Sequence, residues 1–325
     1  MSRPLERHFR AFGKHLPGAI EGEVEPLHQC RVATRRLREL LPLCAPEMSR
    51  ATTDRARRRL RRVGRALGRV REVDVALQLV AELSRQGVVE GDAKDRLRQH
   101  LVDERGERRE QMLDGLGAVN TRKLERDLAD IARLLGMRHQ TDAWAYTLAT
   151  QMGSRAQHLR NAIGVAGALY IADRVHAVRI AAKKLRYSLE FALETGEARV
   201  KGAVRHVREV QDTLGRLHDL DVLAILVQDL TIPHGDAPWN GDLEAMRRLW
   251  LERECRELHG QYVAKQGVLH ETCDTATRTA ERIRVERGGG CLPGQHVEPA
   301  GRVLKMQLDD TRGAAQKTTR GRSGR

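Results

Sequence analysis

The chain has 325 residues, of which 40% are hydrophobic, so it can bury a substantial core as one large domain or as two related halves. Its formal net charge of +14 makes polyanions the expected partners: nucleic acid, an anionic membrane surface or a phosphate polymer. Aromatic residues make up only 3% of the sequence, which argues against a protein that stacks single-stranded bases on aromatic side chains.

The hydrophobic pattern and the cysteines indicate where in the cell the protein is expected. No run of 18 apolar residues is present, and the basic N-terminus lacks the apolar stretch of a signal peptide. The five cysteines show no CxxC spacing and no zinc pattern with histidine, and four of them fall on helical patterns. We therefore expect a soluble cytoplasmic protein whose cysteines are small, reduced and at least half-buried residues.

The first half of the chain is predicted to be helical throughout. Residues 1–25 are expected to form an N-terminal helix and a linker, the helix covering 3–16 and ending at Pro17-Gly18. Residues 26–140 are expected to form a first bundle half. Its helices are predicted to run from about Pro26 to the prolines at 42–46, over 49–84, from the glycines at 87–91 to about Gly115, and over 120–136.

Residues 141–287 are predicted to repeat this organisation as a second bundle half. Helices are expected over 141–164, over 174–194 with Asp173 as the capping residue, over 197–230, over 242–264 after a loop that contains Pro233 and Pro238, and to about 287. Residues 288–325 are rich in Gly, Thr, Arg and Lys and are expected to be a disordered basic tail. No convincing strand pattern occurs, so the fold is predicted to be all-α, with two antiparallel four-helix bundles related by a pseudo-twofold axis.

One motif occurs twice. The segment His28-Gln-Cys-Arg-Val-Ala-Thr-Arg-Arg-Leu-Arg38 returns as His176-Ala-Val-Arg-Ile-Ala-Ala-Lys-Lys-Leu-Arg186. At 3.6 residues per turn, positions i, i+3, i+7 and i+10 of each copy share one side of a helix, opposite an apolar side. That side carries cations with almost no acidic residues beside them. Because the pattern is repeated, it favours an anion-binding surface over a merely solvated basic face.

The repeat extends over the following helix. Residues Leu67–Asp74 return as Leu214–Asp221, and both copies contain a glycine, Gly68 and Gly215, inside a helical pattern. Glycine costs about 1 kcal/mol in a helix relative to alanine, so the two glycines suggest a close approach between facing elements. The helix over 49–84 also carries an arginine stripe, and the helix over 197–230 carries Lys201, Arg205 and Arg208.

These residues resemble the CHAD domains, the conserved-histidine α-helical domains. The resemblance rests on the two motif copies, the second followed by Tyr187, and on Gln211-Asp-x-Leu-Gly-x-Leu-His-Asp219, and it covers about residues 5 to 285. It implies two helical bundles that face each other across a basic channel, which binds inorganic polyphosphate. This chain has Arg71-Glu72 where the later copy has His218-Asp219, so any role of that histidine is not symmetric.

The expected polyphosphate ligands are cationic or protonatable side chains of four helices. Carried over by position, the resemblance implies His28, Arg31, Arg35, Arg36, Arg38, His176, Arg179, Lys183, Lys184 and Arg186. The basic stripes of the neighbouring helices add Arg58, Arg62, Arg65, Lys201, Arg205 and Arg208. Arginine suits this task because its guanidinium stays charged and donates two parallel hydrogen bonds to phosphate oxygens.

The two motif histidines have several interpretations. They could ligate a metal, act as acid-base catalysts, donate hydrogen bonds to phosphate, or be satisfied structural residues. Neither has a companion ligand or nucleophile at a suitable spacing, so donation to phosphate fits best, and a polyanion would then favour the imidazolium form at mildly acid pH. We expect no catalytic residue, no metal site and no cofactor.

The predicted function is therefore non-enzymatic binding of polyphosphate in the cytoplasm, at polyphosphate granules or with polyphosphate-metabolising enzymes as partners. The first alternative is a nucleic-acid-binding protein, which the charge and the basic tail favour, although nucleic acid is expected only as a weaker polyanion. The second is a phosphohydrolase, for which no carboxylate set, phosphate-cradling loop or nucleophile motif is visible. No membrane partner is expected.

Overall fold

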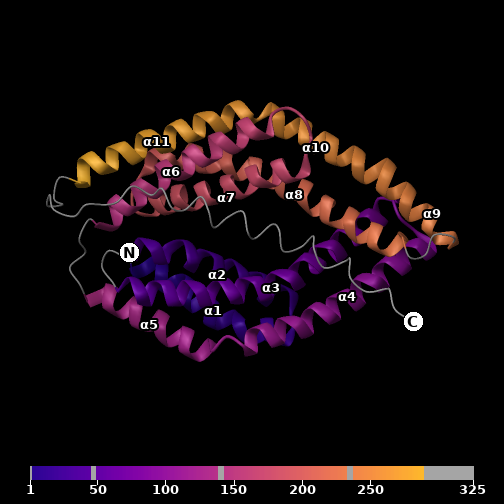
Figure 1. Cartoon of the computed structure of the whole chain (residues 1–325), viewed down its shortest axis with the longest axis horizontal. Helices are drawn as coiled ribbons and strands as arrows, with labels where there is room; N and C mark the ends of the chain where they lie inside the picture. Colours follow the sequence, from indigo (N-terminus) through magenta and orange to yellow (C-terminus); the bar gives the residue numbers. More distant parts are fainter. Residues whose placement is uncertain (1, 45–48, 138–142, 233–236, 289–325) are drawn as a thin grey trace, which may run out of the picture. The chain divides into compact units, whose positions relative to one another are not determined.

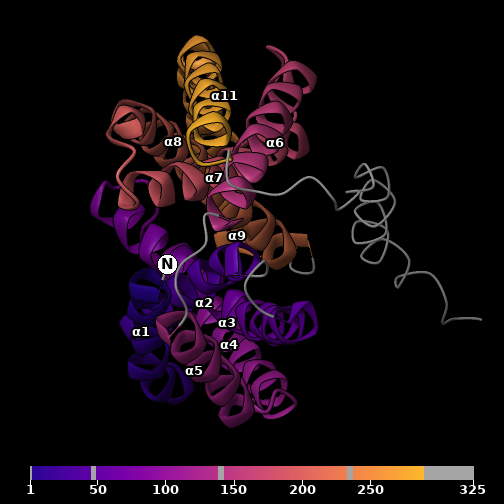
Figure 2. The same cartoon turned by 90° about the vertical axis from the view of Figure 1, so that its left-hand side faces the viewer.

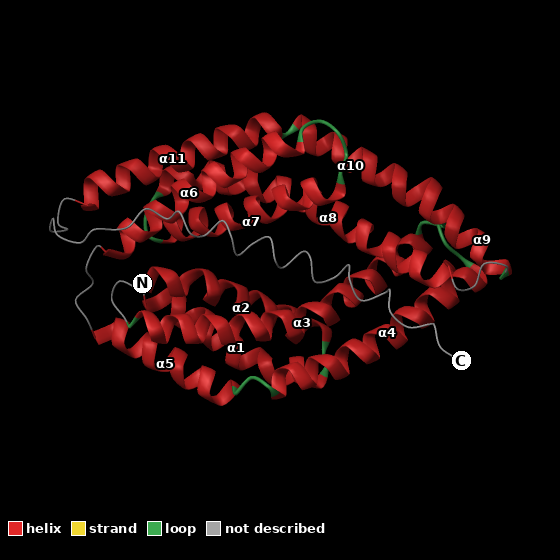
Figure 3. Cartoon of the chain, in the orientation of Figure 1, coloured by secondary structure: helices red, strands yellow, loops and turns green. Residues whose placement is uncertain are grey.

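The structure is a computed structural model that describes residues 2–44, 49–137, 143–232 and 237–288. Every regular element in these ranges is helical and no strand occurs there, so the predicted all-α class is confirmed (Figure 3). None of the described helices is long and apolar enough to cross a membrane. The predicted tail lies outside the described residues, apart from Gly288 at the end of the last helix.

A first group of helices is built from α1 (Ser2–Glu21), α2 (Val24–Cys44), α3 (Arg50–Arg85), α4 (Gly91–Gly117) and α5 (Thr121–Met137) (Figure 1). Helix α1 lies along α2 and also contacts α5, while α3 packs against α2, α4 and α5. The apolar faces that the sequence pattern predicts form this core: Leu27, Leu37, Leu60 and Leu67 are fully buried.

The predicted end of the first helix at Pro17-Gly18 is wrong, because Pro17 lies inside α1 and the helix continues to Glu21. Proline removes one backbone hydrogen bond, but Leu16 and Ala19 on either side of it are buried against the core, and this packing outweighs the loss. The chain turns at Gly22, whose φ of +88° is natural for glycine. Arg105 of α4 donates to the Gly22 carbonyl oxygen at 2.7 Å and so helps to close the helix end.

A second group contains α6 (Ala143–Ala166), α7 (Ala172–Glu194), α8 (Lys201–Thr231), α9 (Pro238–Ala245), α10 (Glu252–Ala264) and α11 (Gln266–Gly288). A 3₁₀ turn, Ala198–Val200, precedes α8, and a π-helical segment, Met246–Leu251, joins α9 to α10. Helix α11 lies along α6, α7 packs between α6 and α8, and α10 packs on α8.

Two details of the second group differ from the predictions. Asp173 is not the cap of α7, because Ile171 holds that position and Asp173 lies in the first helical turn, where a carboxylate still favours the positive end of the helix dipole. The loop predicted up to residue 241 is shorter, since Pro238 starts α9. Proline suits the first turn of a helix because its missing N–H would have no partner there.

The two groups contact each other through α3 with α8, α2 with α6, and α4 with α8 and α9 (Figure 2). Ion pairs reinforce these contacts: Arg155 of α6 lies 2.5 Å from Glu39 of α2, and Arg216 of α8 binds Glu82 of α3 at 2.7 and 2.8 Å. The two copies of the repeated motif, on α2 and α7, are thereby held in one body. The pseudo-twofold relation between the groups stays a prediction.

Candidate anion-binding site

The basic faces of the two motif copies lie close together. Burial lowers the pKa of Arg31 on α2, and the charge of Arg179 on α7 lowers it further. Burial likewise lowers the pKa of Arg35, with Arg31 and Arg186 among the nearby charges that add to the effect. We call Arg31, Arg35, Arg179 and Lys183 the central cluster. The stripes of the two copies therefore meet in one place and do not form two separate surfaces.

Lys183 is the most strongly affected member of the central cluster. Burial, followed by the charges of Arg35 and Arg179, lowers the pKa of Lys183 to about 6. Burial and the neighbouring positive charges therefore favour the neutral amine at pH 7 in the free protein. An anion placed beside it would reverse this balance and draw a proton onto the amine.

Several polar groups around the central cluster lack a partner. Among the described residues, the buried Nε atoms of Arg35, Arg38 and Arg186 have no hydrogen-bond partner, and neither does the Tyr187 hydroxyl. Buried donors in folded proteins nearly always have a protein, water or ligand partner, so these groups are available to bind an acceptor from outside the chain. The nearby carboxylates Glu72 and Asp219 raise the pKa of Arg179, but burial and the charge of Arg35 outweigh them and the net shift is downward.

Tyr187 organises three of the arginines. The guanidinium carbons of Arg35, Arg36 and Arg186 lie 5.5, 4.7 and 5.4 Å from the centroid of its ring. These are cation–π distances, and the three cations come from both motif copies. Tyr187 is 5% exposed, so its ring is held in place between α2 and α7.

Three of the predicted ligands surround one buried carboxylate, Glu190 of α7. Arg208 of α8 donates to Glu190 Oε1 at 2.7 and 2.9 Å, Arg186 lies 3.8 Å away, and Arg36 of α2 forms a further ion pair. Burial alone would raise the pKa of Glu190, but the arginines outweigh it and the pKa is lowered. We call Glu190, Arg36, Arg186 and Arg208 the Glu190 cluster. Each of its arginines is paired with Glu190, whereas the central cluster contains no carboxylate.

Arg31 also fixes how α2 meets α3. Its Nη1 donates to the Gly64 carbonyl oxygen at 3.3 Å, and a Cβ atom on Gly68 would lie 2.4 Å from the same nitrogen. Gly68 therefore makes room for a site arginine and not for a facing helix. The expected close approach at Gly215 is wrong, because a Cβ there would meet no atom within 4 Å.

A further group of arginines surrounds Arg38. Burial lowers the pKa of Arg38, and although Glu39 opposes this, Arg61, Arg57 and Arg65 lower it further. Of these, only Arg65 and Arg38 were predicted as ligands. Arg57 and Arg61 were not among the predicted ligands. The helical period could have identified them, because positions 57 and 61 lie on the same face of α3 as Gly64 and Gly68.

The remaining predicted cations lie in more open places. Arg58 and Arg62 are exposed on α3, one position further along the chain from Arg57 and Arg61. Lys184 and Lys201 are exposed as well, and Arg205 is exposed and lies 3.8 Å from Glu209. Side chains of this kind can add long-range attraction for a polyanion, which salt screens.

The histidines lie beside the central cluster. The Nδ1 atoms of His176 and His218 are 3.3 Å apart, and burial together with Arg179 lowers both pKa values, that of His218 to about 4. Burial and the charge of Arg71 lower the pKa of His28. His218 was absent from the predicted ligands, although the second repeat contained it. Within the described ranges, no three His, Cys, Asp or Glu side chains converge as metal ligands do.

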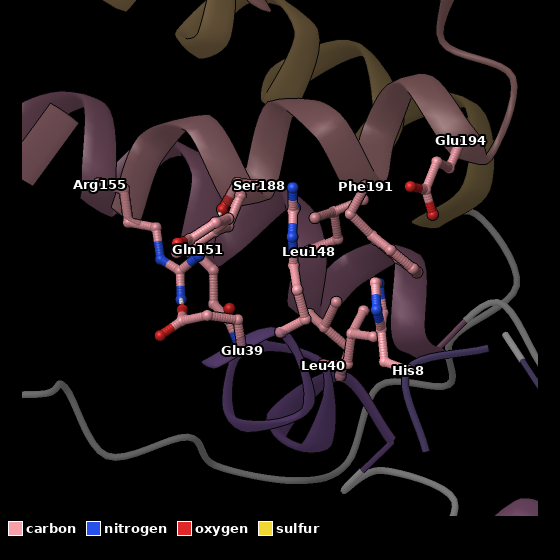
Figure 4. A pocket seen from close by; sticks show the side chains of 12 residues that line it. His8, Glu39, Leu40, Leu148, Gln151, Arg155, Ser188, Phe191 and Glu194 are labelled. Carbon is pink, nitrogen blue, oxygen red and sulfur yellow. Dashed lines mark hydrogen bonds and ion pairs between the residues drawn. The ribbon is translucent and has the colours of Figure 1, made fainter. Parts of the chain in front are cut away.

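A pocket adjoins these residues where α1 and α2 meet α6 and α7 (Figure 4). Tyr187 and Arg36 form part of its wall, and Figure 4 shows Arg155 and Glu39 pointing toward each other across it. Arg155 also donates to the Ser188 hydroxyl at 2.9 Å. Because Glu39 and Glu194 line the pocket together with Arg36 and Arg155, its charge is mixed.

Comparisons with known proteins bear on the family and the fold of the chain. A family model described as the CHAD domain matches residues 3–228. The crystal structure of the CHAD domain from the plant Ricinus communis is 22% identical, with 86% of this chain and 90% of that chain covered and a TM-score of 0.51. PptA from Streptomyces chartreusis is 16% identical, with 86% and 97% covered and a TM-score of 0.53. At these identities the structural likeness shows the fold alone. No curated protein matches the sequence.

Proposed function

We propose that this chain, which belongs to the CHAD domain family, binds inorganic polyphosphate at the central cluster between α2 and α7. The observation that carries the proposal is the meeting of cations from both motif copies whose charge Glu72 and Asp219 offset only in part, with the pKa of Lys183 lowered towards the neutral form of its amine. Folding such a cluster costs free energy, because buried like charges repel each other. A polyanion at this place would remove the repulsion and supply acceptors for the unpartnered guanidinium nitrogens.

Polyphosphate suits the central cluster because negative charges repeat along the polymer at regular intervals. Each phosphate unit carries about one negative charge and several acceptor oxygens, so a linear polymer can engage cations from α2 and α7 in succession. The central cluster offers guanidiniums that present two parallel donors, together with a lysine that becomes charged on contact. The module then acts by binding, with no chemical step. It would work in the cytoplasm, where it would bring the protein to polyphosphate granules or to enzymes that make or consume the polymer.

Nucleic acid is the competing ligand, and one observation favours it. The N-terminal half of α3 exposes Arg55, Arg57, Arg58, Arg61 and Arg62, a surface on which any phosphate backbone could lie. The half-buried central cluster favours the thinner polymer, since a duplex cannot place its phosphates among side chains that lie between two helices. Competition between the two polymers therefore separates the two functions.

The test is a titration with long-chain polyphosphate and with duplex DNA at about 150 mM salt, comparing the wild type with Arg31→Ala/Arg179→Ala. We expect tighter binding of polyphosphate than of DNA, and at least about a tenfold loss of polyphosphate affinity in the double variant. The matched control is Arg278→Ala/Arg284→Ala, which removes two exposed arginines of α11. Equal affinity for both polymers, unchanged by the α2 and α7 substitutions, would refute the proposal.

A further inference from the structure

The repeat allows each end of the site to be compared with its counterpart. Arg38 of α2 corresponds to Arg186 of α7, 148 positions later, and Arg61 of α3 corresponds to Arg208 of α8, 147 positions later. Two guanidiniums thus occupy matching places in the two copies, one on the motif helix and one on the helix that follows it. The charges around these pairs differ.

In the second copy, a buried carboxylate lies beside the pair and offsets part of its charge. The Glu190 side chain is 6% exposed and pairs with both Arg186 and Arg208, at 3.8 and 2.7 Å. It also holds Arg36 from α2. Asp212 adds a second negative charge on α8, at the position that corresponds to Arg65. A phosphate that approached this end would have to displace Glu190 from its arginines.

In the first copy, no carboxylate takes that place, since the residue that corresponds to Glu190 is Pro42. Arg38 has three further arginines beside it, and its buried Nε has no partner among the described residues. We call Arg38, Arg57, Arg61 and Arg65 the α3 arm. The last three are exposed, so an anion can reach them from solvent.

Glu39, the carboxylate that most affects the pKa of Arg38, is already occupied. Glu39 accepts a hydrogen bond from Arg155 of α6 at 2.5 Å, and this ion pair joins the two helix groups. Glu39 therefore compensates Arg38 only in part. The arm presents four positive charges, whereas the matching positions of the second copy hold two arginines, Val204 and Asp212. Glu190 pairs with both of those arginines and with Arg36.

We propose that a polyphosphate chain longer than the central cluster extends along the α3 arm and not across the Glu190 cluster. This inference rests on the proposed function and gives the bound polymer a direction. Phosphates beyond the central cluster meet unpaired guanidiniums on the α3 arm, whereas on the Glu190 cluster they meet arginines that already bind a carboxylate. Coulomb attraction therefore favours the α3 arm. Affinity should then increase with chain length until the arm is filled.

The test compares tripolyphosphate with a long polyphosphate at about 150 mM salt. The arm variant is Arg57→Gln/Arg61→Gln, and the control is Arg278→Gln/Arg284→Gln on α11, which removes the same charge from exposed positions. We expect the arm variant to bind the long polymer about tenfold more weakly, with a salt dependence less steep by about 1.5 in the log–log slope, because two cations are removed. Binding of tripolyphosphate should change by less than about twofold in either variant.

Three results would overturn the extension along α3, and a fourth would overturn the proposed function itself. An arm variant that binds the long polymer as the wild type does, or an α11 control that loses as much, would overturn the extension along α3. A tenfold loss for tripolyphosphate in the arm variant would do the same, because the arm would then belong to the central cluster. If Arg31→Ala/Arg179→Ala leaves tripolyphosphate binding intact, the proposed function itself fails, whatever the arm does.

Discussion

In the Glu190 cluster, three arginines surround one buried carboxylate, and the pKa of that carboxylate is lowered as a result. In the central cluster, a short distance along the same helices, three arginines and Lys183 gather with much weaker compensation, and the pKa of the lysine falls to about 6. The same residue types therefore serve two purposes. The arginines of the Glu190 cluster hold α2, α7 and α8 together through their shared carboxylate. The cations of the central cluster repel each other, and a bound anion would reduce this repulsion.

The largest effect is expected where the pairing is broken. Glu190→Gln leaves Arg36, Arg186 and Arg208 without their common carboxylate, and loss of one partner of a buried ion pair costs about 3–5 kcal/mol. Urea denaturation should show this as a lower free energy of unfolding. Glu209→Gln, which removes an exposed carboxylate 3.8 Å from Arg205, should cost less than about 0.5 kcal/mol. Equal losses in the two variants would mean that the Glu190 cluster has no structural role.

The opposite effect is expected where the cations are unpaired. Lys183→Met removes a buried cation that repels its neighbours, so the free protein should become more stable by about 1 kcal/mol at pH 6, while polyphosphate affinity falls by about tenfold. The gain should shrink as the pH rises from about 6 towards the lysine pKa of the unfolded chain, because the penalty for charging Lys183 is fully present only below its folded pKa. Denaturation at several pH values, together with a titration, measures both effects. A variant that loses stability and affinity together would contradict this account.

A smaller effect is expected in the pH dependence of binding. A bound polyanion raises the pKa of Lys183 and of the histidines beside it, so binding takes up protons. Affinity should be highest near pH 6 and should fall by about tenfold towards pH 8, as the protons that binding must take up become scarcer. Calorimetry in buffers of different ionisation enthalpy measures the proton uptake. His28→Ala/His176→Ala should reduce this uptake, and Lys183→Met should reduce it more.

The smallest effects are expected at the paired glycines. Gly68→Ala pushes the Arg31 guanidinium aside, because the new Cβ would lie 2.4 Å from Nη1, and polyphosphate affinity should fall by about threefold to tenfold. Gly215→Ala meets no atom within 4 Å, so it should leave affinity unchanged and stabilise α8 by about 1 kcal/mol. Thermal unfolding and titration of both variants provide the comparison. Equal binding losses would show that Arg31 is not positioned over Gly68.

Much of this arrangement could be predicted from the sequence. The period of the apolar residues placed most helices within a few residues of their observed bounds, and the motif resemblance to the CHAD family is confirmed by the family match. The end of α1 was missed because local proline and glycine signals suggested a stop, while packing around Leu16 and Ala19 carries the helix further. Local patterns cannot measure that contribution.

The site was predicted less completely. The repeat identified the cations on α2 and α7, yet nothing in the pattern distinguished Arg35, which lacks a partner for its Nε, from Arg36, which Glu190 holds. That distinction depends on which side chain of another helix comes near, so it needs the tertiary structure. On α3 the prediction named Arg58 and Arg62, each one position after Arg57 and Arg61, because many arginines of that helix fit a helical period.

If the two motif copies form a single binding site, the stoichiometry of tripolyphosphate binding must show it. Calorimetric titration of the full chain at about 150 mM salt should give one high-affinity site per chain, and Arg31→Ala or Arg179→Ala alone should weaken that one site. Two equivalent sites per chain, each lost with only one of the two substitutions, would contradict the account, because α2 and α7 would then bind phosphate separately.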